Sequence, residues 1–178
     1  IMNQFPKVAI LGCSDSRVPI EIVFDQGLGD VFTIRVAGNA YGTGVAASID
    51  YAVSHLHVKV VVVLGHEGCG AVKAARLPDE AIEKEPESLK LMLQDMKSGL
   101  ADKLHILDSI LDSRARDREA VCVHAQQHAK RVLENEATQK LVQEGKLLVL
   151  AGFYEISSGI VDFFEPPANP KAKANVVG

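Results

Sequence analysis

Short apolar runs, separated by polar and glycine-rich segments, recur along this chain. Four of them are rich in Val, Ile and Leu and lie at residues 8–11, 31–36, 58–64 and 146–153. Runs of this length, bounded by Gly and Asp, are typical of buried strands in a parallel sheet. Between the runs, apolar residues recur three or four positions apart, which predicts amphipathic helices, most clearly over residues 45–56 and 89–111.

Strands that alternate with helices predict an α/β fold, here a mostly parallel β-sheet of about four to five strands flanked by α-helices. Residues 77–86 contain two prolines and several acidic residues, and we expect them to form a surface connection and not a domain boundary. We therefore predict a single domain over residues 1–165. Residues 166–178, with several prolines and small polar residues, are expected to form an extended C-terminal tail.

Composition narrows the range of partners. The 178 residues are 47% hydrophobic, and 19 basic against 23 acidic residues give a net charge of −4. Such a chain has no general electrostatic basis for binding nucleic acid or an anionic membrane, so we expect a small-molecule partner. No apolar run approaches the ~20 residues that span a bilayer, and no leader peptide is recognisable, so we expect a soluble protein. The three cysteines do not resemble a disulfide framework, which favours the cytoplasm or an organellar, protected compartment.

Two polar segments carry the candidate chemistry, and each begins where an expected strand ends. The first contains Cys13, and the second contains His66 and Cys69. Open α/β sheets bind their ligands at the carboxyl ends of the strands. Thiolate and imidazole donors favour Zn²⁺ over Mg²⁺ or Ca²⁺, and three protein ligands with one open position are typical of a catalytic zinc site. The sequence therefore predicts one zinc ion per chain.

Each of these residues, taken alone, has a simpler interpretation. A single Cys at a strand end usually packs in the core, and the pair Asp15 and Arg17 would usually be a solvated ion pair. Cys122 lies between two valines, so we expect it to pack in the core and not to bind metal. The glycines around His66 run in the wrong order for a dinucleotide fingerprint. Five histidines are expected to be surface or satisfied core residues: His55, His57, His105, His124 and His128.

Taken together, the segments resemble the β-class carbonic anhydrases. The signature segments are Cys13-Ser14-Asp15-Ser16-Arg17 and His66-Glu67-Gly68-Cys69. Further similar segments lie at residues 25–32, 35–39 and 145–159, so the resemblance extends from residue 8 to about residue 164.

The resemblance implies an enzyme with zinc bound by Cys13, His66 and Cys69. It would catalyse the reversible hydration of CO₂ to bicarbonate and a proton, by attack of a zinc-bound hydroxide on CO₂. Asp15 and Arg17 would be the catalytic pair beside the metal. The residues implied for the substrate pocket are Gln26, Gly38, Asn39 and Gly70.

The resemblance also implies a homodimer or a multiple of dimers, in which Gln26 of one chain approaches the metal site of the other. Only seven residues precede the first expected strand, where the family carries helices that wrap a partner subunit, so we expect this chain to lack those helices. The chain has no Trp, and it has His124 near a position where many relatives have Asn. The regulatory bicarbonate sites of some subtypes are therefore not transferred to it.

Two other functions fit the same residues. The scaffold could hydrolyse a CO₂ analogue such as CS₂ or COS, because the nucleophile would be the same and only access to the pocket would differ. It could also be a non-catalytic module that binds zinc or bicarbonate. The role of Asp15 is open as well, because its carboxylate could orient the zinc-bound hydroxide or bind the zinc as a fourth ligand.

Overall fold

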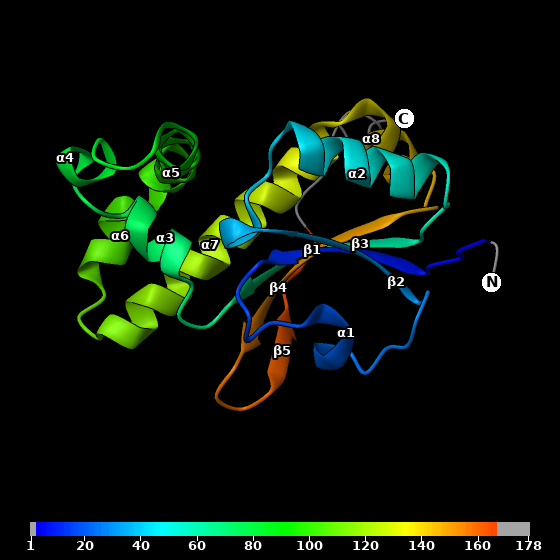
Figure 1. Ribbon diagram of the computed structural model, residues 1–178, viewed down its shortest axis with the longest axis horizontal. Helices are drawn as coiled ribbons and strands as arrows, with labels where there is room; N and C mark the ends of the chain where they lie inside the picture. The colour runs from blue at the N-terminus through cyan, green and yellow to red at the C-terminus, as the bar shows by residue number, and fades with distance from the viewer. Residues whose placement is uncertain (1–2, 167–178) are drawn as a thin grey trace, which may run out of the picture.

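A computed structural model describes residues 3–166, with a five-stranded sheet at the centre (Figure 1). The strands are β1 (Val8–Cys13), β2 (Val31–Val36), β3 (Val60–His66), β4 (Leu148–Glu155) and β5 (Ile160–Phe163), in the spatial order β2-β1-β3-β4-β5. The first four are parallel, and β5 is antiparallel to β4. The expected α/β fold with a mostly parallel sheet is confirmed.

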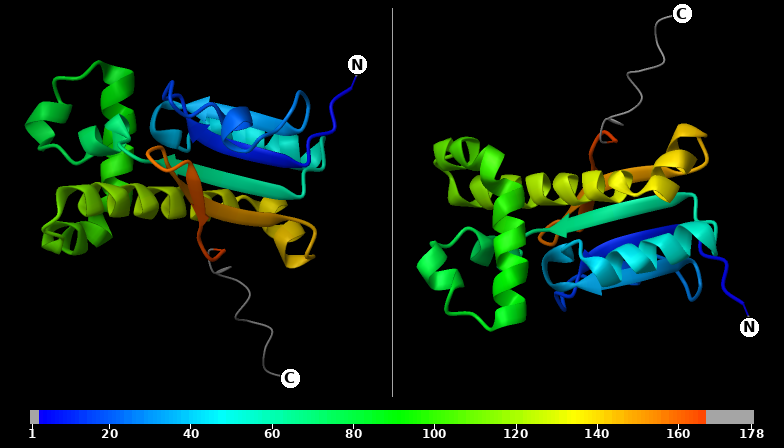
Figure 2. Two further views of the ribbon diagram at one scale, coloured as in Figure 1. Left: turned by 90° about the horizontal axis from the view of Figure 1, so that it is seen from below. Right: turned by 90° about the horizontal axis from the view of Figure 1, so that it is seen from above.

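Helices cover both faces of the sheet. They are α1 (Ile20–Val23), α2 (Thr43–Ser54), α3 (Gly70–Ala75), α4 (Asp79–Ile82), α5 (Glu87–Leu100), α6 (Leu104–Ser109), α7 (Ser113–Glu134) and α8 (Glu136–Gln143), with 3₁₀ turns η1 (Ala37–Asn39) and η2 (Ala101–Lys103). Helices α2, α7 and α8 lie on one face and α1 lies on the other (Figure 1). Helices α3 to α6 form a group beyond the carboxyl ends of β1 and β3 (Figures 1 and 2).

Alternate strand residues face the two helix layers. Leu11 and Val63 are buried in one apolar cluster with residues of α2 and α7, whereas Ile10 and Val62 are buried in another with Ile20 of α1. Side chains of a strand point to opposite faces in turn, so a parallel sheet covered on both faces must be apolar along its whole length. This explains why the strands appear in the sequence as continuous apolar runs.

The second half of the chain differs from the expected helices. The pattern over residues 89–111 forms two helices, α5 and α6, separated by η2 just after Gly99, a residue that lowers helix propensity. A short helix, α4, lies within the expected surface connection at residues 77–86. Helix α7 was not among the expected helices, because its buried face includes Cys122, His124 and His128 among small and aliphatic residues.

The described residues include no helix that is long and apolar enough to cross a membrane. Of the expected tail at residues 166–178, all but the first residue lie outside the part of the chain that the structure describes.

Candidate metal centre

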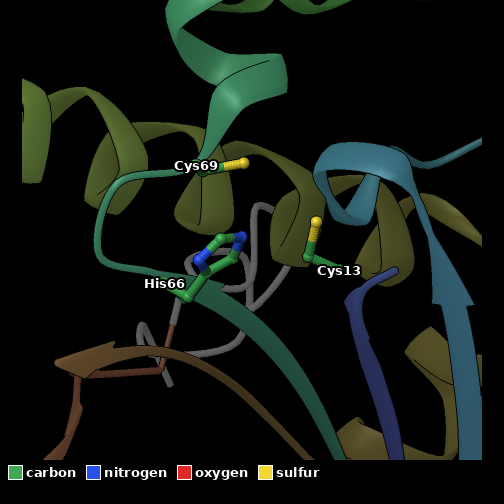
Figure 3. A group of neighbouring side chains, drawn as sticks. All are labelled: Cys13, His66 and Cys69. Atoms are coloured by element: carbon green, nitrogen blue, oxygen red, sulfur yellow. The ribbon is translucent and has the colours of Figure 1, made fainter. Parts of the chain in front are cut away.

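The sheet order brings the two candidate segments together. Cys13 ends β1 and His66 ends β3, and these two strands are neighbours in the sheet. Cys69 follows three residues later, as the residue that caps α3. The sulfur atoms of Cys13 and Cys69 and a ring nitrogen of His66 all lie within 4.8 Å of one another (Figure 3). The next strand after β1 is β2, on one side of this pair, whereas the next strand after β3 is β4, on the other side. Open α/β sheets bind ligands in the crevice that forms at such a point.

The donor atoms fit a metal ion. All three side chains are buried, and that of His66 is fully so. The Nδ1 atom of His66 lies 3.0 Å from the carbonyl oxygen of Glu67, which can only accept, so Nδ1 carries the ring proton. Nε2 then presents a lone pair, yet it is buried and has no hydrogen-bond partner among the described residues. An unpaired buried acceptor is costly, and metal-binding histidines usually donate their other N–H to a carbonyl or carboxylate.

The pKa values of the two thiols are shifted in opposite directions. A hydrogen bond from the Cys69 thiol, together with contacts to His66 and to two backbone N–H groups, lowers the pKa of Cys13 to about 4. The backbone donors are the N–H groups of Gly38 and Asp15, whose nitrogens lie 3.2 and 3.4 Å from Cys13 Sγ. The hydrogen bond between the two thiols is also the main cause that raises the pKa of Cys69, and burial is the second. These opposite directions make Cys13 the first of the two thiols to lose its proton, and thiolate is the form of Cys that binds metal.

Asp15 lies beside the three donors. Its Oδ2 atom is 3.9 Å from His66 Nε2. Arg17 binds the carboxylate in a bidentate manner, with Nε 3.0 Å from Oδ1 and Nη2 2.7 Å from Oδ2. The Arg17 backbone N–H also donates to Oδ1, at 2.9 Å. These contacts, the side-chain hydrogen bond of Arg17 above all, hold the pKa of Asp15 well below its usual value, so the group is a carboxylate at any physiological pH.

Two further charged side chains fix the backbone of the site, through contacts that were not predicted from the sequence. Arg35 on β2 donates from Nε to the carbonyl of Cys13 at 2.9 Å and from Nη2 to the carbonyl of Asp15 at 2.7 Å. The Glu67 carboxylate accepts from Arg114 Nη2 at 3.1 Å and from the N–H of Ser157 at 2.9 Å. Both act across long sequence separations, which local patterns cannot reveal.

The four residues expected in the substrate pocket have different positions. Gly38 and Asn39 are buried in the turn after β2, both with a left-handed backbone, φ 61° and 44°. Gly70 is the exposed first residue of α3. Gln26 is exposed, and its amide donates to the carbonyls of Phe24 and Asp25 in its own loop. Of these four, Gly38 is the one that forms a hydrogen bond with a candidate metal ligand, the sulfur of Cys13.

Two cavities of about 710 Å³ each flank the centre. One is lined largely by charged residues and includes Arg17, together with Glu67 and Gly68, which lie between His66 and Cys69 in the sequence. The other lies between β2, the start of α2 and α5, and many of its lining residues are apolar. Its lining residues Val36 and Ala40 pack in the same apolar cluster as Cys13 and Cys69.

The remaining cysteine and histidines occupy core or surface positions outside the group of metal ligands. Cys122 is buried in α7 and is not part of the group of donors. His55, His57 and His105 are exposed. His124 and His128 are buried on α7 and hydrogen-bonded to the loop that follows β2. Their spacing of four residues, which puts two side chains on one helix face, was the signal that could have identified them as a pair.

Comparisons with known proteins identify the family. A tetrameric β-carbonic anhydrase of Sordaria macrospora has the same fold, with a TM-score of 0.84 and 28% sequence identity over 91% of this chain and 82% of that one. The family model described as carbonic anhydrase matches residues 8–161. The chain belongs to the β-class carbonic anhydrase family. β-Class carbonic anhydrases depend on zinc in general, which agrees with the donor set found here.

Named carbonic anhydrases are similar over part or most of this chain. Carbonic anhydrase 2 of Mycobacterium tuberculosis is 57% identical over 73 residues, which are 41% of this chain and 35% of that protein. A carbonic anhydrase of Synechococcus elongatus is 31% identical over 169 residues, which are 89% of this chain and 60% of that protein. The matched regions thus span between about one third and three fifths of these relatives.

Proposed function

We propose that this chain is a zinc-dependent carbonic anhydrase, which interconverts CO₂ and bicarbonate with release of a proton. The observation that carries the proposal is the convergence of Cys13, His66 and Cys69 around an unpaired, buried Nε2 atom, with a permanently charged carboxylate beside them. Membership of the β-class family supports the same reaction.

The three donors would hold one zinc ion and leave one position open, because Cys122, the third cysteine, lies outside the group. When bound, zinc supplies a water molecule whose pKa is lowered to about 7, and this provides the nucleophile that CO₂ requires. The N–H groups of Gly38 and Asp15 would stabilise the charge of the Cys13 thiolate. The carbonyl of Glu67 would keep His66 in the tautomer whose Nε2 faces the donors.

Asp15 would orient the attacking water by accepting its proton in a hydrogen bond, and Arg17 would keep that carboxylate charged and turned toward the site. The bidentate contact with Arg17 uses both carboxylate oxygens, and Oδ2 is also the oxygen near His66 Nε2. The same oxygen could bind the metal directly and close the site. Zinc spectroscopy across pH, beside activity, would distinguish these two roles.

We also propose a dimer or a multiple of dimers. The tetrameric state of the Sordaria macrospora relative supports this, as do two fully or largely exposed apolar side chains near Gln26, Ile22 at 76% and Leu28 at 101%. Gln26 would approach the metal centre of a partner, since its own amide lies on an exposed loop. Light scattering with activity measured across dilution tests this, and a concentration-independent active monomer would contradict it.

Stopped-flow measurement of CO₂ hydration tests the function itself. Protein stripped of metal should be inactive, and one equivalent of zinc per chain should restore activity. A panel with CS₂ and COS should show weaker turnover than with CO₂. Faster turnover of an analogue would replace the proposed substrate, and zinc binding without any turnover would indicate a non-catalytic binding module.

A further inference from the structure

The loop that joins β2 to α2 is buried and has an unusual backbone. Gly38 and Asn39 both have positive φ, and an added Cβ on Gly38 would lie 2.8 Å from Ala71 Cβ and 2.9 Å from Met96 Cε. Only glycine fits such a position without strain. The Gly38 N–H donates to Cys13 Sγ at 3.2 Å, so this loop directly contacts a proposed zinc ligand.

Two histidines of α7 hold the loop at both ends. His124 Nε2 lies 2.7 Å from the carbonyl oxygen of Gly38, and because a carbonyl can only accept, Nε2 is the donor. His128 Nδ1 accepts the backbone N–H of Tyr41, at 3.0 Å. The two rings pack edge to face, with centroids 4.2 Å apart. One imidazole therefore donates to the loop and the other accepts from it.

The contact with Tyr41 requires a neutral His128, because only an unprotonated Nδ1 can accept. Burial lowers the pKa of His124 to about 4 and that of His128 to about 2. A protonated His128 would present an N–H to the N–H of Tyr41, and the contact would be lost. At neutral pH both rings are therefore in the same tautomer, with the proton on Nε2 and an unprotonated Nδ1.

We propose that His124 and His128 are positioning residues that hold the Gly38 N–H on the sulfur of Cys13 and thereby limit the negative charge which this thiolate donates to the metal. The inference rests on the proposed zinc ligation by Cys13, His66 and Cys69. Two thiolates make a bound zinc ion a weaker Lewis acid, and an N–H donor on one sulfur withdraws part of that charge. Residues on a helix that supplies no ligand would then set the acidity of the water at the centre.

Cobalt(II) in place of zinc gives a readout that does not depend on turnover, because its thiolate-to-metal charge-transfer band reports the charge on sulfur. The variants come in matched pairs. His124→Gln keeps an N–H donor at similar reach and His124→Leu removes it, whereas His128→Asn keeps an acceptor and His128→Leu removes it. Leu133→Ala, a cavity elsewhere on α7, controls for lost stability alone.

Both Leu variants should move the charge-transfer band to longer wavelength, since the sulfur becomes richer in electrons, and should shift the pH inflection of CO₂ hydration upward. His124→Gln, His128→Asn and Leu133→Ala should keep the wild-type band. A merely structural role would lower stability or amplitude and leave band and inflection in place, and that result would overturn the proposal.

If the Leu variants do not fold, His124→Asn decides, because its shorter amide donor cannot reach Gly38. A wild-type band in His124→Asn would contradict the proposal, and a shifted band beside an unshifted His124→Gln would support it. Wild-type protein that binds no cobalt at all would overturn the zinc site itself. Cobalt bound by every variant with an identical band would overturn only the role of the histidines.

Discussion

The two sides of the metal centre are held in different ways. The β1 side is fixed from within, by a buried loop that α7 holds through two neutral histidines. The β3 side, residues 66–69, is fixed from outside, where Glu67 contacts Arg114, which is 81% exposed, and the exposed Ser157. Buried hydrogen bonds are costly to break, whereas exposed ion pairs contribute little and are screened by salt. Changes on the β1 side should therefore have the larger effects.

The largest effect should come from replacing a metal ligand, and each side of the centre supplies at least one. Cys69→Ser should remove most of the bound zinc, since a neutral hydroxyl is a poor substitute for a thiolate. Cys122→Ser is the matched control, because this buried cysteine lies outside the donor group. Elemental analysis of both purified variants measures the difference. Equal zinc loss in both would show that the ligands are assigned wrongly.

Asp15→Asn should lower turnover by about 10- to 100-fold and leave zinc bound, because a group that orients the ligand shell is lost while the ligands stay. The amide is isosteric, but it loses its charge and its pairing with Arg17, and it can present a donor to the attacking water. Raising the pH should not rescue a defect of orientation. Stopped-flow rates from pH 6.5 to 9, with zinc measured on the same samples, test this. Full activity with full zinc content would reduce Asp15 to a solvated partner of Arg17.

The histidine pair should make the β1 side sensitive to acid. The folded-state pKa values of His124 and His128, about 4 and about 2, lie below the unfolded value near 6.5, mainly because of burial. The hydrogen bond to Gly38 partly opposes the shift at His124, and His124 lowers the pKa of His128 further. Arg131 lowers both pKa values, whereas Asp95 and Cys13 raise that of His124. The unfolded chain therefore takes up more protons, so the stability of the neutral pair is complete above pH 6.5 and is lost as the pH falls.

Between pH 7 and pH 5, this loss should amount to about 2 kcal/mol for each histidine. Denaturant unfolding of the wild type and of the double variant His124→Gln, His128→Asn measures it, as the difference between their pH slopes. The double variant keeps the hydrogen bonds and removes both titrating rings, so its slope should be shallower. Identical slopes would mean that these rings do not become charged on unfolding.

The smallest effect should come from the β3 side. Glu67→Gln keeps the backbone carbonyl that orients His66, removes the charge that pairs with Arg114 and replaces one of the two acceptor oxygens by an amide NH₂. We expect zinc affinity to fall by less than about fivefold, and the difference to shrink as salt is added. Glu85→Gln, at an exposed position in the connection at residues 77–86, is the control. A larger, salt-independent loss would show that this side is held as firmly as the other.

The parts of this picture that the sequence predicted are those with local signals. The parallel strands were predicted by apolar runs, and the segments around Cys13 and His66 by their position at strand ends. Helix α7 was missed because its buried face carries His124, His128 and Cys122, so its apolar periodicity is weak. The contacts of Arg35, Glu67 and the histidine pair join residues that lie far apart in the chain, and only the folded backbone brings them together.

X-ray absorption at the zinc edge of the purified, zinc-loaded protein tests the central claim most directly, because it counts the atoms bound to the metal. An open site held by Cys13, His66 and Cys69 predicts two sulfur atoms at about 2.3 Å, one imidazole nitrogen at about 2.0 Å and one further light atom. Cys69→Ser should lose one sulfur from this shell if any metal remains. A shell with three or more sulfur atoms, or with none, would contradict the account.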